Sequence, residues 1–249
     1  MNIALIGHRG EPETYPENSL AGYAAILAAG ARYIETDVQV TADDIPVLSH
    51  DPSLLRVTGH DLEITATTYR DLSELPAGYP SRFGERFADL HMSRLDEFAA
   101  LLAKYPSATA FIELKDTSIK AHGAERVVDR IIETLDAVLP QCILISFVQD
   151  ALWHARAVST LPIGWVLPEW SEHHHRHAQD LAPEYLLCNR KRLPPASETL
   201  WQGPWRWVVY TVDTAQEVHA FGVRGIDMVE TNVIRQLLLD PKLSGTGCG

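Results

Sequence analysis

Carboxylates that share one face of two predicted strands are the side chains best suited to hold a metal ion. In the segment YIETDV, Glu35 and Asp37 point the same way because side chains alternate along a strand. The same alternation places Glu113 and Lys115 of the segment FIELK on one face. A solvated strand end would accommodate either pair, but two strands of the same design favour a site. Three carboxylates supply the oxygen ligands that Mg²⁺ or Ca²⁺ prefers.

Two histidines and two cations accompany these carboxylates. His8 and Arg9 follow the first apolar run, and His50 follows another. Histidines at separate strand ends suit a general base and a general acid because each exchanges protons near neutral pH. Arg9 and Lys115 add positive charges that can bind a phosphate oxygen. These carboxylates, histidines and cations suit phosphoryl transfer better than glycoside hydrolysis, for which a pair of carboxylates suffices.

The elements that must position these groups alternate between strand and helix. Apolar, β-branched runs alternate with amphipathic segments, which predicts βα units and a parallel sheet. Eight such strands in 249 residues predict an α/β protein with a closed (β/α)8 barrel. The expected strands are residues 2–7, 33–40, 109–114, 142–147, 162–167, 185–188, 207–212 and 226–231.

An extra apolar run, IPVLSH at residues 45–50, lies too close to the preceding strand for a parallel crossover. We therefore expect an antiparallel hairpin that turns near Asp43. The residue numbers of facing partners then sum to about 86, which places His50 opposite Thr36. In this register the imidazole lies beside Glu35 and Asp37.

Domain organisation follows from where this alternation is interrupted. Residues 51–93 are irregular and rich in proline and glycine, and we interpret them as a small insertion over one end of the barrel. We expect a single domain over residues 1–249, with a frayed tail at about residues 244–249. No internal repeat is evident.

Composition excludes several classes of partner. The net charge of −12 argues against nucleic acid or an anionic membrane as the main partner, because both are polyanions. No stretch reaches the roughly 20 apolar residues of a transmembrane segment. Three widely spaced cysteines and the lack of a signal-peptide pattern favour a reduced, cytoplasmic location.

The segment EHHHRH at residues 172–177 is also rich in possible metal ligands. It follows a predicted strand end, and adjacent histidines can hardly all bind one ion. We therefore interpret the segment as a solvated, pH-sensitive polar loop and not as the metal site. Its role is left open at this point.

The chain resembles the glycerophosphodiester phosphodiesterases over nearly its whole length. Five segments carry the resemblance in order: GHRG, PENS, YIETDV, PVLSHD and FIELK. Weaker matches are ISF, VVYTVD and GIDMVETN. The resemblance implies a TIM barrel with a small insertion after the second strand. It also implies one divalent metal ion, a small-molecule glycerophosphodiester substrate and the products sn-glycerol 3-phosphate and an alcohol, within lipid and glycerol metabolism.

The resemblance also implies roles for particular residues. The metal ligands would be Glu35, Asp37 and Glu113. His8 would be the general base and His50 the general acid. The remaining implied positions bind phosphate (Arg9 and Lys115) or support the metal site from a nearby loop (Glu17 and Asn18).

Two departures from the family pattern leave the substrate preference open, because Tyr210 and Asp213 stand where Trp and Asn are common. One alternative is a phosphodiesterase that acts on lysophospholipid or sphingolipid head groups. Another is a barrel that binds phosphorylated metabolites without catalysis. The leaving alcohol, the choice between Mg²⁺ and Ca²⁺ and the oligomeric state are not determined by the sequence.

Overall fold

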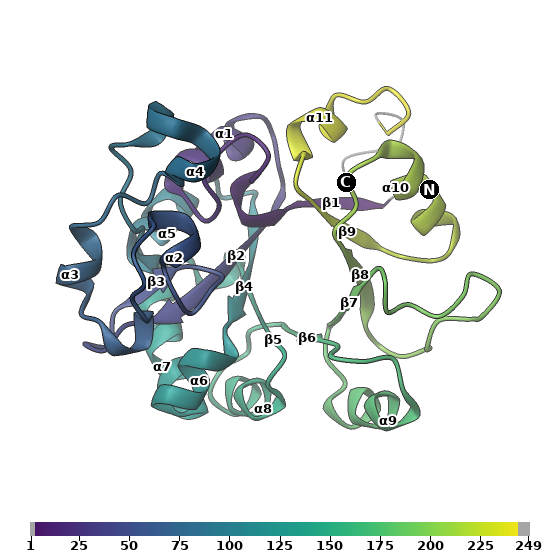
Figure 1. The fold of residues 1–249 in the computed structure, drawn as a ribbon. Helices are drawn as coiled ribbons and strands as arrows, with labels where there is room; N and C mark the ends of the chain where they lie inside the picture. Colours follow the sequence, from purple (N-terminus) through teal and green to yellow (C-terminus); the bar gives the residue numbers. More distant parts are fainter. Residues whose placement is uncertain (1–2, 244–249) are drawn as a thin grey trace.

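Parallel strands form a closed ring in the computed structural model, which describes residues 3–243 (Figure 1). The strands of the ring are β1 (Ala4–Gly7), β2 (Tyr33–Val40), β4 (Thr109–Leu114), β5 (Cys142–Ser146), β6 (Ile163–Val166), β7 (Tyr185–Asn189), β8 (Arg206–Tyr210) and β9 (Met228–Thr231). Neighbours pair in the order β1-β9-β8-β7-β6-β5-β4-β2, and a β1–β2 pairing closes the ring. The predicted TIM barrel is confirmed.

Apolar side chains fill the barrel in two layers because each strand is covered on both faces. The inner layer is one cluster inside the ring: Ile6, Phe111, Ile143, Ile145, Val166, Leu187, Val208 and Met228. The outer layer lies between the strands and the surrounding helices and includes Ile34 and Val38 of β2. Alternate residues of β2 therefore face outward, and Glu35 and Asp37 face the barrel mouth.

The α-helices outside the ring are amphipathic, and their apolar faces join the outer layer. Ser19 caps α1 by accepting a hydrogen bond from the Gly22 N–H, and Gly30 follows the helix with φ +94°. The surrounding helices are α1 (Leu20–Ala28), α5 (Leu95–Leu102), α6 (Asp116–His122), α7 (Ala124–Leu135), α8 (Gln149–Val158), α9 (Glu172–Leu181), α10 (Ala215–Val223) and α11 (Ile234–Leu238). Short 3-10 turns are η1 (His8–Gly10) and η4 (Asp136–Gln141).

The histidine-rich segment lies in α9, so the prediction of a polar loop there was wrong. Ser171 caps this helix by accepting a hydrogen bond from the His174 N–H. Ala178 and Leu181 are buried on its inner face. The cap and the apolar spacing stabilise a helix in a segment whose composition is otherwise polar.

The strand β3 (Pro46–Leu48) lies outside the ring and pairs antiparallel with β2. The facing pairs are Val38–Leu48, Gln39–Val47 and Val40–Pro46, so the predicted register is confirmed. The backbone N–H of Ser49 then donates to the Asp37 carbonyl oxygen over 3.0 Å. The hairpin therefore brings the chain back past Asp37, so that His50 follows beside the middle of β2.

Residues that follow β3 form short helical turns beside the hairpin (Figure 1). These elements are α2 (Leu55–Thr58), η2 (Ile64–Ala66), α3 (Tyr69–Ser73), α4 (Pro80–Phe83) and η3 (Gly84–Phe87). The strand β3, the turn η2, the helix α3 and adjoining residues contribute to a small apolar cluster of Val47, Leu54, Ile64, Leu72 and Met92. Among the described residues, no helix combines the length and the apolar character needed to cross a membrane. The expected tail at residues 244–249 lies outside the described residues.

Candidate active site

Three carboxylates meet at the carboxyl ends of β2 and β4. Asp37 and Glu113 are paired across the two strands, and Glu35 lies on the same face of β2. Carboxylate oxygens of the three residues all lie within 4.8 Å of one another. Glu35 and Asp37 are buried, with 2% and 0% of their surface exposed. The predicted cluster is therefore formed, inside the barrel mouth.

Two cations lie directly against this cluster. The Arg9 Nε atom is 2.9 Å from Asp37 Oδ2, an ion pair without hydrogen-bond alignment. Lys115 Nζ donates to Asp37 Oδ1 over 3.1 Å and to Glu113 Oε1 over 2.7 Å. Burial acts to raise the pKa of Asp37, but Arg9 and Lys115 outweigh it and lower that pKa. Asp37 is therefore ionised in the site.

Nearby cations compensate the negative charges of Glu35 and Glu113 less fully than that of Asp37. Burial, reinforced by the Asp37 charge, raises the pKa of Glu35 well above its usual range. Burial also raises the pKa of Glu113, against the opposing effect of Lys115. The Glu35 Oε1 atom is buried without a hydrogen-bond partner among the described residues. A hard divalent cation with oxygen ligands fits this site, because it supplies the charge and the partner that Glu35 lacks.

His8 is held at the edge of the cluster by two polar side chains, Asn232 directly after β9 and Asp213 in the loop after β8. Its Nδ1 atom lies 2.8 Å from Asn232 Oδ1, and Asn232 Nδ2 donates to Asp213 Oδ2 over 3.0 Å. Because a carboxylate only accepts, the Asn232 amide nitrogen must face Asp213 and its oxygen must face His8. His8 therefore donates from Nδ1 and carries its lone pair on Nε2.

The free ring nitrogen of His8 is directed toward the carboxylates. Nε2 lies 3.9 Å from Glu35 Oε2. Burial and the neighbouring Arg9 charge lower the pKa of His8 to about 4. His8 is therefore unprotonated at neutral pH, with Nε2 directed toward the three carboxylates.

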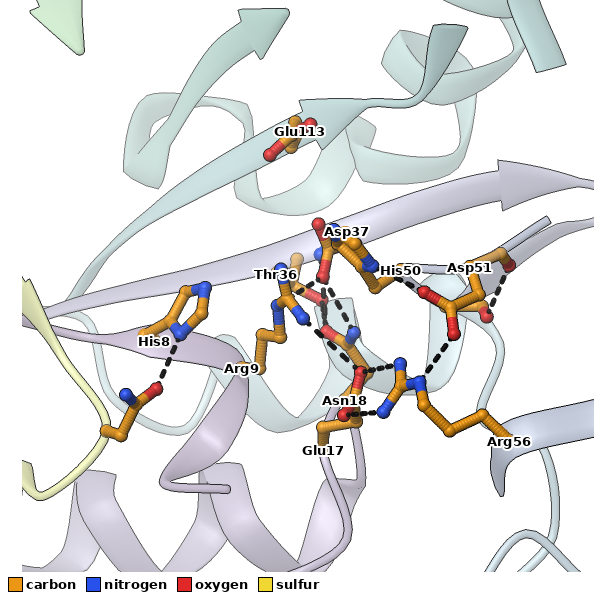
Figure 2. Close-up of polar contacts among 12 residues, drawn as sticks. His8, Arg9, Glu17, Asn18, Thr36, Asp37, His50, Asp51, Arg56 and Glu113 are labelled. Carbon is orange, nitrogen blue, oxygen red and sulfur yellow. Dashed lines mark hydrogen bonds and ion pairs between the residues drawn. The ribbon is translucent and has the colours of Figure 1, made fainter. Parts of the chain in front are cut away.

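His50 lies on the other side of Arg9 and Asp37 (Figure 2). Its Nδ1 atom is 2.7 Å from Asp51 Oδ1, and Asp51 Oδ2 accepts from Arg56 Nε over 2.5 Å. Asp51 therefore orients the imidazole through Nδ1 and leaves Nε2 available. The two histidines flank the cluster from separate segments, as the sequence predicted.

Glu17 and Asn18 connect these groups. Glu17 forms a two-bond ion pair with Arg56, and its Oε1 lies 3.5 Å from Arg9 NH1. Asn18 Nδ2 donates to Asp37 Oδ2 over 2.9 Å. The side-chain oxygen of Asn18 accepts from the Tyr23 hydroxyl over 2.8 Å and from the Asp37 N–H over 3.2 Å. Asn18 thus contacts one of the three carboxylates, and Glu17 contacts two arginines beside them.

A small cleft opens beside His50, between the rim of the barrel and the insertion. One side is formed by Glu17 and Asn18, and the other includes Val57, Ala77 and Met92 of the insertion. The insertion thus contributes to the surroundings of the site. The aromatic residues Phe83 and Phe87 of the insertion do not line this cleft and pack edge-to-face on each other.

Four further polar residues at the site were missed as functional groups. Asn232 and Asp51 lie in segments that carry the family resemblance, which was the available signal. Glu230 is two residues after the inner-core Met228 on β9, and burial and Glu113 raise its pKa to about 8. Strand alternation signalled its inward direction. Nothing in the sequence pattern signalled Arg56, which lies in the irregular insertion.

Known proteins resemble the chain in sequence and in fold. The model of the glycerophosphoryl diester phosphodiesterase family matches residues 8–236. A glycerophosphodiester phosphodiesterase of Caldanaerobacter subterraneus is 34% identical over 102 residues, 41% of each chain. One of Bacillus altitudinis is 32% identical over 129 residues, 52% of each chain. The matches thus span about half of these curated relatives or less.

A solved structure has the same barrel. The Oleispira antarctica phosphodiesterase in complex with the product sn-glycerol-3-phosphate superimposes with a TM-score of 0.82. The superposition covers 95% of each chain at 22% sequence identity. At this identity the likeness establishes the fold alone.

Divalent cations should stabilise the protein through the three carboxylates. At 100 times its dissociation constant, an ion that binds only the folded state adds about 2.7 kcal/mol. For a chain of this size this raises Tm by about 5–10 °C. We expect this shift with Mg²⁺, Ca²⁺ or Mn²⁺ in thermal unfolding, and its loss in Glu113→Gln.

The matched control is Glu133→Gln, which alters an exposed carboxylate on α7 and should retain the full shift. The predicted ion site is wrong if none of the three ions shifts the wild-type Tm. It is equally wrong if Glu113→Gln responds as the wild type does.

Proposed function

Because the chain belongs to the glycerophosphoryl diester phosphodiesterase family, we propose that it hydrolyses glycerophosphodiesters to sn-glycerol 3-phosphate and an alcohol. The observation that carries this proposal is the carboxylate cluster flanked by His8 and His50. A binding protein has no need of an unprotonated base and a second imidazole on opposite sides of one site. The Oleispira relative, solved with sn-glycerol-3-phosphate as its product, supports the same substrate class.

In the first step, His8 Nε2 accepts the proton of the glycerol 2-hydroxyl, whose oxygen attacks phosphorus. A new P–O bond forms a cyclic phosphate, and the bond from phosphorus to the alcohol breaks. The imidazolium form of His50 donates its Nε2 proton to the departing alkoxide and becomes a neutral imidazole. The tautomer that Asn232 imposes on His8 leaves Nε2 ready for this transfer. An attacking group within the substrate also gains from proximity.

In the second step, water opens the cyclic phosphate with the two histidines in reversed roles. His50 Nε2 takes a proton from water, and His8 returns its proton to the 2-oxygen as the ring P–O bond breaks. Both residues end the cycle in their starting protonation states. Arg9 and Lys115, which both form ion pairs with Asp37, would offset the negative charge on the phosphoryl oxygens.

We infer that Glu35, Asp37 and Glu113 would hold one hard divalent cation, Mg²⁺ or Ca²⁺. When bound, such an ion supplies positive charge that stabilises phosphoryl oxygens and lowers the pKa of a hydroxyl. The donor set supports this choice because every ligand is a carboxylate. Arg56 and Glu17 support the site from outside by fixing Asp51 and the loop beside Arg9.

The direct test is hydrolysis of a panel of substrates with and without chelation. Glycerophosphocholine, glycerophosphoethanolamine and glycerophosphoinositol should each be tested for release of sn-glycerol 3-phosphate. We expect activity that stops with EDTA and returns when Mg²⁺ or Ca²⁺ is added.

The same panel includes the outcomes that would overturn this proposal. Turnover of lysophospholipid micelles without turnover of glycerophosphocholine would favour a phosphodiesterase acting on lipid head groups. Saturable binding of glycerophosphodiesters, with no product under any metal, would favour a non-catalytic barrel.

Replacement of His50 by alanine should lower kcat at least about 100-fold at saturating metal, the usual effect of losing an acid–base group. Because His50 protonates the leaving group in the first step only, the loss in the single-turnover rate of alcohol release should be much smaller for the substrate whose leaving alcohol is p-nitrophenol, which departs without a proton. His154→Ala, on the outer surface of α8 beside Asp129, is the control. Equal losses on both substrates would remove the acid role from His50.

Replacement of Asn232 by alanine should lower kcat between about 10- and 100-fold, because His8 loses the acceptor that fixes its tautomer. KM should change little. Burial and Arg9 lower the pKa of His8, and both remain in the Asn232 variant. The pKa of His8 should therefore stay below its usual value of 6.5 in the variant. The acidic limb of kcat/KM should therefore not move to higher pH. A KM effect with unchanged kcat would contradict this positioning role.

A further inference from the structure

Four histidines lie on α9, and the helix distributes them over different faces. His175 stacks on Trp201, with ring centroids 4.7 Å apart. His173 and His177 instead lie one helical turn apart on another face, with ring centroids 4.2 Å apart. Both faces lie on the outside of the barrel, away from the three carboxylates.

The spacing of His173 and His177 is the i, i+4 spacing at which two imidazoles on a helix bind one metal ion. His173 is exposed and His177 is partly buried. The His177 ring stacks on Trp165 of β6, with centroids 6.5 Å apart and planes 26° apart. One imidazole of the pair is therefore fixed on an aromatic face, and the other can turn toward it from solvent.

A neighbouring helix orients His177 further. Its Nδ1 atom lies 2.9 Å from the side-chain oxygen of Gln149, the first residue of α8. Because an amide oxygen only accepts, Nδ1 carries the hydrogen and Nε2 carries the lone pair. Histidines that bind metals are held in this way by an outer acceptor. Gln149 thus prepares His177 as a ligand through Nε2.

We propose that His173 and His177 form a second metal site, which binds a late first-row divalent cation such as Zn²⁺, Ni²⁺ or Cu²⁺. Imidazole nitrogens favour these ions, whereas carboxylates favour Mg²⁺ and Ca²⁺. The protein thus separates two classes of ion by ligand chemistry. Water completes the coordination at the surface of α9, and the site is independent of the proposed hydrolysis.

The test is Zn²⁺ binding to the full chain without an affinity tag, measured by titration calorimetry and equilibrium dialysis. Saturating Mg²⁺ keeps the carboxylate cluster occupied. We expect one Zn²⁺ per wild-type chain and at least a tenfold weaker affinity in His173→Ala and in His177→Ala. Gln149→Ala should bind about 10-fold more weakly, the usual effect of losing an outer partner. His175→Ala, on the other face, should bind as the wild type does.

A spectroscopic measurement on the wild-type chain tests whether two imidazoles bind one ion, even if a variant fails to fold. Cu²⁺ bound to the wild-type chain should give an electron paramagnetic resonance spectrum with coupling to two imidazole nitrogens. Absence of this coupling would overturn the proposal. Wild-type Zn²⁺ affinity in the folded His173→Ala and His177→Ala variants, or an equal loss in His175→Ala, would overturn it as well. None of these measurements uses turnover, so failure here leaves the proposed hydrolysis intact.

Discussion

One oxygen from each of three carboxylates lies within 4.8 Å of the others, two of the residues are buried, and this crowding of negative charge is the constraint on which the rest of the site depends. At an effective dielectric constant of about 20, each ionised pair at that distance repels by about 3.5 kcal/mol. Arg9 and Lys115 offset this repulsion mainly at Asp37, which both of them contact. Within residues 3–243, the Glu35 Oε1 atom has no hydrogen-bond partner. The negative charge at the barrel mouth is thus not fully neutralised by Arg9 and Lys115. A bound cation is the simplest group that could neutralise the rest.

The same charges connect the barrel to the insertion. From Asp37, contacts run through Arg9 and Glu17 to Arg56, which belongs to α2. Arg56 also holds Asp51, which orients His50. His50 is therefore held by a segment outside the ring, whereas His8 is held by Asn232 next to β9. Each histidine has its own outer partner, and the two supports share no residue.

Strand periodicity predicted most of this arrangement. Alternation along β2 and β4 placed the three carboxylates on one face, and a short connection gave the register of β3 with His50 at its end. These inferences succeed because backbone geometry alone determines them. Arg56 was not predictable, because its role depends on the path of an irregular segment. The helix α9 was missed because a cap at Ser171 and two buried apolar residues outweigh a polar composition.

The short strand β3 pairs with β2 along one edge, and in the described part of the chain its other edge has only the bridge between Val47 and Arg94 and the hydrogen bond from the Leu48 N–H to the Ser93 carbonyl oxygen. Segments with fewer backbone hydrogen bonds open at lower free energy than the closed core around them. Amide protons of the hairpin should therefore exchange with solvent sooner than those of β1. As the temperature rises, the chain would lose the geometry of His50 while the ring, and His8 with it, is still intact. Inactivation would then precede unfolding and would reverse on cooling.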